Sequence, residues 1–432
     1  MKNFFFAIIL TLSFRGLVVA QEQQDTLVIL DEKISEVKGQ VEGINETVLE
    51  MKSTLDALKK IKLSGYIQSQ FQSIENDGAA SFSGGSFSTG MHNRISVRRG
   101  RLKVTYDNDL TQYVLQLDAT ERGLGLKDAY IYTKDPWLKT FALKGGVFDR
   151  PFGFEIGYSS SSRETPERSR IFQTLFPGER DLGASIEIFP SAEILNHFNF
   201  KGGFFAGNGV NAEVDNQKDF IGRLGFSLPF YEENLAIDGG VSGYFGKVKL
   251  AAGKYIYTVD SPTLALKDSS NKGWGDRNYI GFDMQIYYDI PVLGGFSLRG
   301  EYITGKQTGS SSSSTSPTAL QTGDLYLRNF SGFYINYVQN IGDRNQLVVK
   351  YDVYDPNTSV SADEIGNAAN AKLGAADLKY STLGLGLVHY WDDNIKFVFY
   401  YDLVKNEKTS KIAAFNDDLK DNVFTFRIQY RF

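Results

Sequence analysis

The chain has 432 residues, with 43 glycines, 10 prolines and no cysteine, and 14% of its residues are aromatic. A formal net charge of −5 argues against nucleic-acid binding, and the lack of cysteine excludes disulfides and thiolate metal sites. After the N-terminus no apolar stretch reaches about 18 residues, so only a closed β-barrel could cross a membrane there. Glycine and aromatic enrichment favours strands and turns. Composition therefore leaves a large soluble all-β protein or an outer-membrane β-barrel.

Residues 1–20 have the pattern of a secretory signal peptide. Lys2 supplies the positive start, residues 4–12 the apolar segment, and Val18-Val19-Ala20 a cleavage site of small residues. The sequence therefore predicts export, with residues 1–20 removed before folding.

Residues 21–62 are predicted to form a coiled coil. Apolar residues recur with alternating steps of three and four, as in the a and d positions of a heptad repeat. A lone helix with such a stripe is poorly stable in water, so we expect self-association, with either two or three strands allowed. The predicted oligomerisation residues are Leu27, Leu30, Ile34, Val37, Val41, Ile44, Val48, Met51, Leu55 and Leu58.

Residues 63–432 alternate between apolar and polar side chains in the manner of a barrel wall. The clearest case is 277–290, where Ile280, Phe282 and Met284 alternate with polar or small residues. Sixteen such segments are predicted, and the even number suits a bacterial barrel. They are about 61–73, 93–107, 110–119, 126–134, 138–149, 182–189, 196–206, 218–229, 234–246, 277–290, 293–306, 328–340, 344–354, 379–390, 394–405 and 421–432.

The links between these segments alternate between short and long. An outer-membrane barrel has this asymmetry, because its turns face the periplasm and its loops face outside. The predicted coiled coil precedes the first strand and is therefore expected in the periplasm. The last strand alternates aromatic residues up to Phe432, which we interpret as the signal read by the barrel-assembly machinery.

Basic residues concentrate in the second predicted strand and in the longest loop. Alternation places Arg99, Arg101 and Lys103 on the polar face, which must be the lumen, because charge on the lipid face is costly. Arg98 has the opposite parity and is expected near a rim or a bulge. The loop 150–181 is rich in apolar residues, so we expect it to fold inward and narrow the pore, with its arginines preferring anions. These are Arg150, Arg163, Arg168, Arg170 and Arg180.

No enzymatic constellation is evident. The only histidines, His92, His197 and His389, are far apart in the sequence, and no hydrolase or metal-protease motif occurs. The sequence predicts a protein that is not an enzyme and that requires no cofactor or metal.

The chain resembles the phosphate-selective porins O and P. The resemblance is strongest in RISVRRGRLKVTY (94–106), LQLDAT (115–120), LKDAYIYT (126–133), LKGGVFDRPFGFE (143–155) and RSRIFQTLFPGERDLG (168–183). It implies a sixteen-stranded trimeric channel with an inward third loop and with arginines at the constriction that pass anions. Arg98, Arg99 and Arg150 match the motif positions of that family most closely.

We therefore expect an all-β fold, a 16-stranded antiparallel transmembrane β-barrel preceded by a periplasmic helix. The expected function is a homotrimeric outer-membrane porin for passive diffusion of small anionic or polar solutes, phosphate-like anions among them. Its expected partners are outer-membrane lipid, the barrel-assembly machinery and further copies of the chain, but no nucleic acid. The alternatives are a sugar or general-diffusion porin, and a structural or adhesive barrel without substrate specificity.

Overall fold

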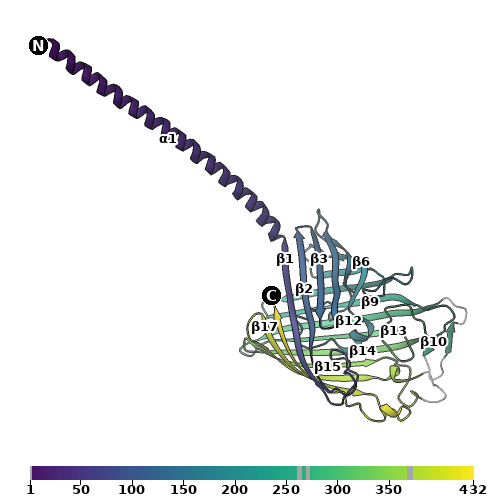
Figure 1. Cartoon of the computed structure of the whole chain (residues 1–432). Helices are drawn as coiled ribbons and strands as arrows, with labels where there is room; N and C mark the ends of the chain where they lie inside the picture. The colour runs from purple at the N-terminus through teal and green to yellow at the C-terminus, as the bar shows by residue number, and fades with distance from the viewer. Residues whose placement is uncertain (1, 260–264, 269–272, 367–372) are drawn as a thin grey trace. The chain divides into compact units, whose positions relative to one another are not determined.

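The computed structural model describes residues 2–259, 265–268, 273–366 and 373–432. The chain divides into two compact units, Met1–Ile61 and Lys62–Phe432 (Figure 1). Among the described residues, no helix is long and apolar enough to cross a membrane.

The first unit is the single helix α1 (Lys2–Lys59). The helix continues without a break through residues 2–20 and beyond, so the backbone shows no boundary at the predicted cleavage site after Ala20. The ten apolar residues of the predicted heptad stripe are all between 45% and 65% exposed. An apolar stripe of this length has no partner within its own unit, and the coiled coil stays a prediction.

The second unit confirms the predicted 16-stranded antiparallel barrel. Eighteen strands of the described residues join one sheet, and two of them, β10 (Ile256–Val259) and β11 (Ala265–Asp268), are short pieces within a long loop. The remaining sixteen form the wall: β1 (Ile61–Ile74), β2 (Asn93–Asn108), β3 (Thr111–Thr120), β4 (Gly123–Lys134), β5 (Phe141–Asp149), β6 (Arg180–Ile188), β7 (Phe198–Phe205), β8 (Asp219–Phe230), β9 (Leu235–Lys249), β12 (Trp274–Ile290), β13 (Gly294–Gly309), β14 (Leu325–Ile341), β15 (Asn345–Asp355), β16 (Tyr380–Tyr390), β17 (Ile395–Asn406) and β18 (Val423–Arg431).

The barrel is closed by pairing of its first and last strands. β1 pairs antiparallel with β18 from Tyr66↔Arg431 to Ile74↔Val423, and β9 pairs directly with β12. Closure removes the free edges that an open sheet would expose. The strand β10, which the sequence did not predict, pairs in parallel with the start of β14 and extends the wall beyond its antiparallel part.

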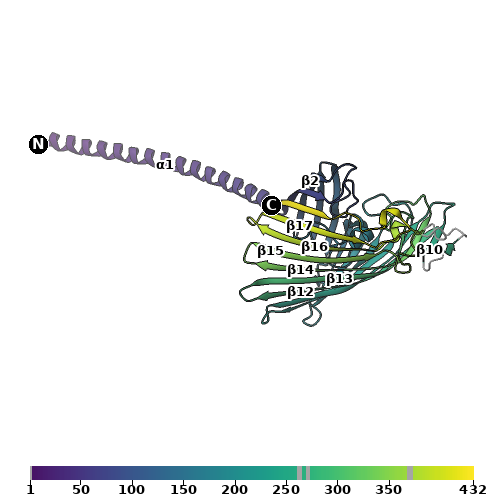
Figure 2. The ribbon, with the colours of Figure 1, turned by 90° about the horizontal axis from the view of Figure 1, so that it is seen from below.

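Apart from the two-residue link between β3 and β4, which is on the side of the long links, the short and long links lie at opposite ends of the barrel, as the alternation of chain direction requires. Figure 2 shows tight turns at one end of strands β12 to β17 and extended loops at the other. The turn between β12 and β13 covers only residues 291–293, whereas the loop between β5 and β6 covers 150–179 and contains the short helix α2 (Arg170–Leu175). We call these the turn side and the loop side.

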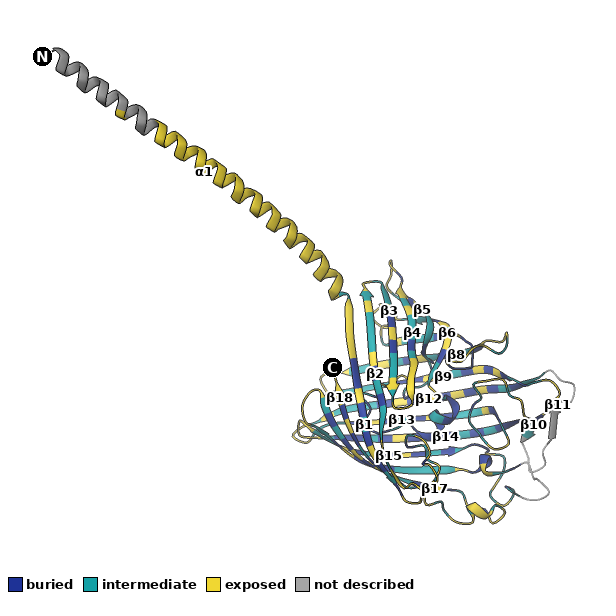
Figure 3. Ribbon diagram, in the orientation of Figure 1, coloured by how far each residue is buried: buried dark blue, intermediate teal, exposed yellow. Residues whose placement is uncertain are grey.

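The two faces of the wall differ in chemistry. On β12, Ile280, Phe282 and Met284 are about half exposed, whereas the intervening Asp283 and Gln285 are buried. Figure 3 shows the same alternation of exposed and buried residues along neighbouring strands. An apolar outer face around a polar interior is what a lipid surrounding requires. The buried polar face lines the lumen and positions the site.

Candidate functional site in the lumen

The loop between β5 and β6, residues 150–179, packs against the inner face of the wall. Six of its apolar side chains are at most 1% exposed, and each contributes roughly 1.5–3 kcal/mol by burial. Phe176 lies 5.8 Å from the ring of Tyr279, and Phe172 lies 6.1 Å from the ring of Tyr334. The whole cluster contains Phe152, Ile156, Ile171, Phe172, Leu175 and Phe176 of the loop and Phe148, Phe205, Ile221, Tyr244, Tyr279, Ile303, Phe330, Tyr334 and Tyr354 of the wall.

Sequence reasoning identified the apolar residues of this loop but not their wall partners. Tyr244, Tyr279 and Tyr334 have the lumen parity of their strands, where we expected polar side chains. The sequence did contain a signal for these wall partners, namely aromatic residues that have lumen parity on nearby strands.

Polar contacts attach the same loop to the other side of the barrel. Gln68 donates to the carbonyl of Ser160 at 2.9 Å, and Lys396 donates to the carbonyls of Ser161 and Arg163 at 2.8 and 3.0 Å. Arg427 donates to the carbonyl of Pro166 at 2.7 Å. The loop is therefore held by an apolar contact on one side and by backbone hydrogen bonds on the other.

Glu167 of this loop joins three arginines. Arg98 Nε lies 2.8 Å from Glu167 Oε1, Arg99 Nη2 lies 2.8 Å from Oε2, and Arg427 Nη2 lies 2.9 Å from Oε1. Burial alone would raise the pKa of Glu167, but the three guanidinium groups hold it well below its usual range. One carboxylate thus faces three positive charges in what we call the Glu167 cluster.

The placement of Arg98 follows from the lengths of β2 and β3. β2 pairs with β3 only from Arg101↔Asp118 onward, so Arg98 lies where β2 extends past its neighbour. Both Arg98 and Arg99 therefore reach the same loop carboxylate despite their opposite parity. This agrees with the rim position expected for Arg98. Arg427, on β18, is not among the predicted site residues, and no pattern in the sequence indicates that it meets Arg98 and Arg99.

Four of the predicted residues line one cavity of about 270 Å³, which we call the basic lumen pocket. Arg101, Lys103, Arg168 and Arg180 lie there with Arg431, against Asp128 and Asp149 as the acidic lining residues. The serines of segment 159–161 and Tyr66 complete part of the lining. The cavity therefore has more basic than acidic side chains.

Carboxylates neutralise most of these basic groups. Arg101 Nε lies 3.0 Å from Asp118, Arg180 Nε lies 2.9 Å from Asp128, and Arg168 pairs with Glu179. Within the described part of the chain, Lys103 and Arg431 form no ion pair. The excess positive charge of the pocket therefore comes mainly from two side chains.

The remaining three predicted residues are buried and lie outside the basic lumen pocket. Arg150 pairs with Asp181 at 3.1 Å, and Arg170 lies between the rings of Phe82 and Tyr380 at 4.2 and 4.0 Å. None of the three guanidinium nitrogens of Arg163 has a hydrogen-bond partner in the described structure. Burial, with Arg168 and Arg99 nearby, lowers the pKa of Arg163 to about 9.

The first long loop, residues 75–92, also turns into the lumen, which the sequence did not predict. Ser83 Oγ donates to Asp402 Oδ2 at 2.5 Å, and Phe82 stacks on Arg170 as described above. Asp421 lies beside them, and burial raises its pKa to about 6 although Arg170 opposes the shift. Two loops, not one, therefore narrow the lumen on the loop side.

Phe432, the predicted barrel-assembly signal, is attached to the wall of the barrel. Its backbone exchanges hydrogen bonds with Gly65 of β1 at 3.0 and 3.1 Å, and its side chain is half exposed. A Cβ on Gly65 would clash with the backbone carbonyl oxygen of Arg101 and approach the ring of Phe432 to 2.7 Å, so a glycine is needed there. No group of three His, Cys, Asp or Glu side chains in the described residues is arranged to hold a metal ion.

Comparison with known proteins gives relatives by structure only. No family model matches the sequence, and no curated protein sequence does either. Solved structures share the fold: Pseudomonas putida OprB has a TM-score of 0.56 at 10% identity, covering 88% of this chain and 96% of its own. The outer membrane channel DcaP of Acinetobacter baumannii has a TM-score of 0.51 at 12% identity, covering 86% and 97%. The trimer form of the Vibrio cholerae outer membrane protein OmpT has a TM-score of 0.50 at 12% identity, covering 86% and 99%. The chain therefore has the barrel fold of outer-membrane proteins and channels.

Proposed function

We propose that this chain is an outer-membrane porin through which small solutes diffuse passively, with a preference for anions. The apolar outer face of the wall suits lipid, and the polar lumen suits water and ions. Two inward loops narrow the lumen, as a size-selective channel requires. The fold shared with outer-membrane channels supports the same reading.

The observation that carries the anion preference is the basic lumen pocket. Lys103 and Arg431 leave positive charge without a paired carboxylate beside a water-accessible cavity of about 270 Å³. Rings of basic side chains favour anions in a pore. Phosphate-like anions, which the resemblance to phosphate-selective porins implies, have the size and charge to enter such a cavity.

We further propose that the protein is a homotrimer joined by α1 in the periplasm. The ten-residue heptad stripe is exposed in the single helix, and coiled-coil formation would bury it. The outward aromatic row that includes Tyr430 and Phe432 is the surface that the barrel-assembly machinery would recognise.

Reversal potentials of the reconstituted protein in a planar bilayer with a KCl gradient test this function. Chloride should be more permeable than potassium, and phosphate should carry current. A cation-selective channel would refute the anion preference and favour a general-diffusion or sugar porin. An assembled barrel without conductance would favour a structural or adhesive role.

A further inference from the structure

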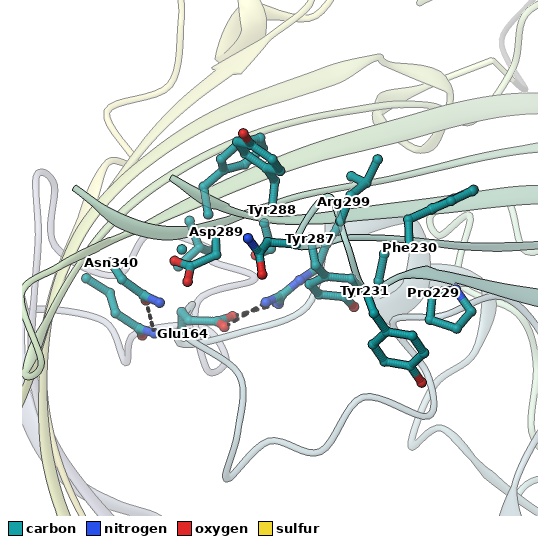
Figure 4. Close-up of a pocket in the computed structure, with 17 residues that line it drawn as sticks. Glu164, Pro229, Phe230, Tyr231, Tyr287, Tyr288, Asp289, Arg299 and Asn340 are labelled. Carbon is teal, nitrogen blue, oxygen red and sulfur yellow. Dashed lines mark hydrogen bonds and ion pairs between the residues drawn. The ribbon is translucent and has the colours of Figure 1, made fainter. Parts of the chain in front are cut away.

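A second cavity lies in the lumen on the turn side, away from the basic lumen pocket. It has a volume of about 460 Å³ and lies among the β8–β9, β12–β13 and β14–β15 turns (Figure 4). That volume is in the range of sites for small organic ligands. We call it the turn-side pocket. None of the predicted site residues lines it, and the proposed ion selectivity does not depend on it.

The positive charge of the turn-side pocket is neutralised. Both terminal nitrogens of Arg299 donate to the carboxylate of Glu164 at 3.0 Å, and the two side chains face each other in Figure 4. Asp289 is then the one lining carboxylate in the described structure without a basic partner. An anion gains no net attraction here, in contrast to the basic lumen pocket.

The other lining groups suit an uncharged ring that carries hydroxyl groups. Tyr287 has the lumen parity of Asp283 and Gln285, and its ring lies 5.8 Å from the Arg299 guanidinium. The amides of Asn340 and Gln346 bond to each other at 3.0 Å, which holds their remaining donors and acceptors in place.

Two further features point to a ligand. Arg299 is 7% exposed and its Nε donor has no partner among the described residues, which is costly for a buried group. Tyr231, on the β8–β9 turn, is 85% exposed and places a second aromatic ring at the lip of the pocket. Aromatic rings with an apolar face and a polar edge bind the faces of ring-shaped solutes.

We propose that the turn-side pocket is a binding site for a neutral saccharide of one or two rings. Tyr287 contacts the apolar face of the sugar, and Asn340, Gln346 and Asp289 bond its hydroxyl groups. The Glu164 carboxylate sets this specificity by neutralising Arg299. The proposal rests on the proposed function, because the sugar reaches the site through the channel.

Sucrose block of single-channel current, with sucrose added on either side of the bilayer, tests the site. Wild-type protein should show saturable, reversible block. Tyr287→Leu should weaken the apparent affinity by about tenfold, because the aromatic contact is lost. Tyr302→Leu is the matched control: Tyr302 lies on the outer face of β13, 44% exposed, and its loss should leave the block unchanged.

Glu164→Gln provides a second variant, in case Tyr287→Leu assembles poorly. Freed Arg299 should make the pocket bind sulfate, so sulfate block should appear in this variant and be absent in the wild type. A wild-type channel that conducts and selects anions without saturable sucrose block would overturn the saccharide site and leave the proposed function intact.

If the barrel does not conduct, calorimetric titration of the detergent-purified protein with sucrose decides the site separately. A saturable heat of sucrose binding in the wild type, with weaker binding in Tyr287→Leu, would support the site even though the channel function had failed. The absence of such heat would refute it.

Discussion

Replacing Glu167 by Gln is the most informative single change in the lumen. The substitution keeps the size of the side chain and one acceptor oxygen but removes the charge that joins Arg98, Arg99 and Arg427. The lumen gains one positive charge, and the loop loses its strongest polar attachment.

The expected loss of stability depends on which hydrogen-bond partners each arginine keeps when the Glu167 charge is removed. Removing one partner of a buried ion pair costs about 3–5 kcal/mol in the extreme. Here Arg99 still donates to Gln68 at 2.9 Å, and Arg427 to Gln70 at 3.0 Å. Arg98, whose side chain is 31% exposed, can turn to water. We therefore expect a loss of about 2–3 kcal/mol.

The expected change in selectivity follows from Coulomb's law. A unit charge about 7 Å from a permeating ion in water changes the energy of that ion by about 0.6 kcal/mol. The shift has opposite sign for anions and cations, so the permeability of each changes about threefold and their ratio by about sevenfold. Reversal potential should thus move toward the anion limit, while open-channel current noise rises because the loop is held less firmly.

The measurement compares Glu167→Gln with Glu121→Gln, which removes an exposed carboxylate 3.6 Å from Arg122. Exposed ion pairs contribute about 0–1 kcal/mol, so the control should match the wild type in both readouts. Equal reversal potential and equal noise in wild type and Glu167→Gln would show that Glu167 neither faces the permeation path nor holds the loop.

Three further predictions concern assembly, selectivity and pH. Ile44→Asp places a charge in the heptad stripe and should convert the trimer to monomers in light scattering of the detergent-solubilised protein; a persistent trimer would exclude α1 from assembly. Lys103→Gln should lower the anion-to-cation permeability ratio by about sevenfold, whereas Lys59→Gln on α1 should not change it. Asp421→Asn removes a carboxyl with a folded pKa of about 6, raised above its unfolded value. The raised folded pKa costs stability that grows as pH rises from the unfolded pKa of about 3.9 to the folded pKa of about 6 and stays constant above it, so the variant should exceed wild-type thermal stability by up to about 3 kcal/mol at pH 7.5 and by less at pH 5. An equal gain at both pH values would show that Asp421 does not titrate as described.

The wall of the barrel could be predicted because the pattern that specifies each strand lies within that strand and its adjoining turns. Each strand alternates side chains with a period of two, as Ile280, Phe282 and Met284 show on β12, and turn residues mark the ends. The pieces that were missed, β10, β11 and α2, are short elements inside long loops. Their formation depends on contacts with β14 and with the inner wall, which no local pattern contains.

The lumen could be predicted only in part, because its contacts join residues far apart in the sequence. Glu167 and Arg427 are separated by 260 positions, and Glu164 and Arg299 by 135. Parity predicts that Arg427 and Arg299 face inward, but not which loop carboxylate each one meets. That choice is made by the apolar packing of Phe172 and Phe176, which fixes the path of the loop.

This pairing changes what the arginines of the sequence do. A guanidinium bound to a carboxylate holds the loop in place and contributes little net charge to a passing ion. Arg101, Arg168 and Arg180 each have such a partner in the described structure, whereas Arg98, Arg99 and Arg427 share the one carboxylate of Glu167. The proposed anion preference must therefore come from positive charge that no carboxylate balances: Lys103 and Arg431 in the basic lumen pocket, and the excess charge of the Glu167 cluster. A channel built in this way keeps a rigid constriction, because paired arginines hold the loop, and a weak, easily altered selectivity, because few positive charges remain unbalanced.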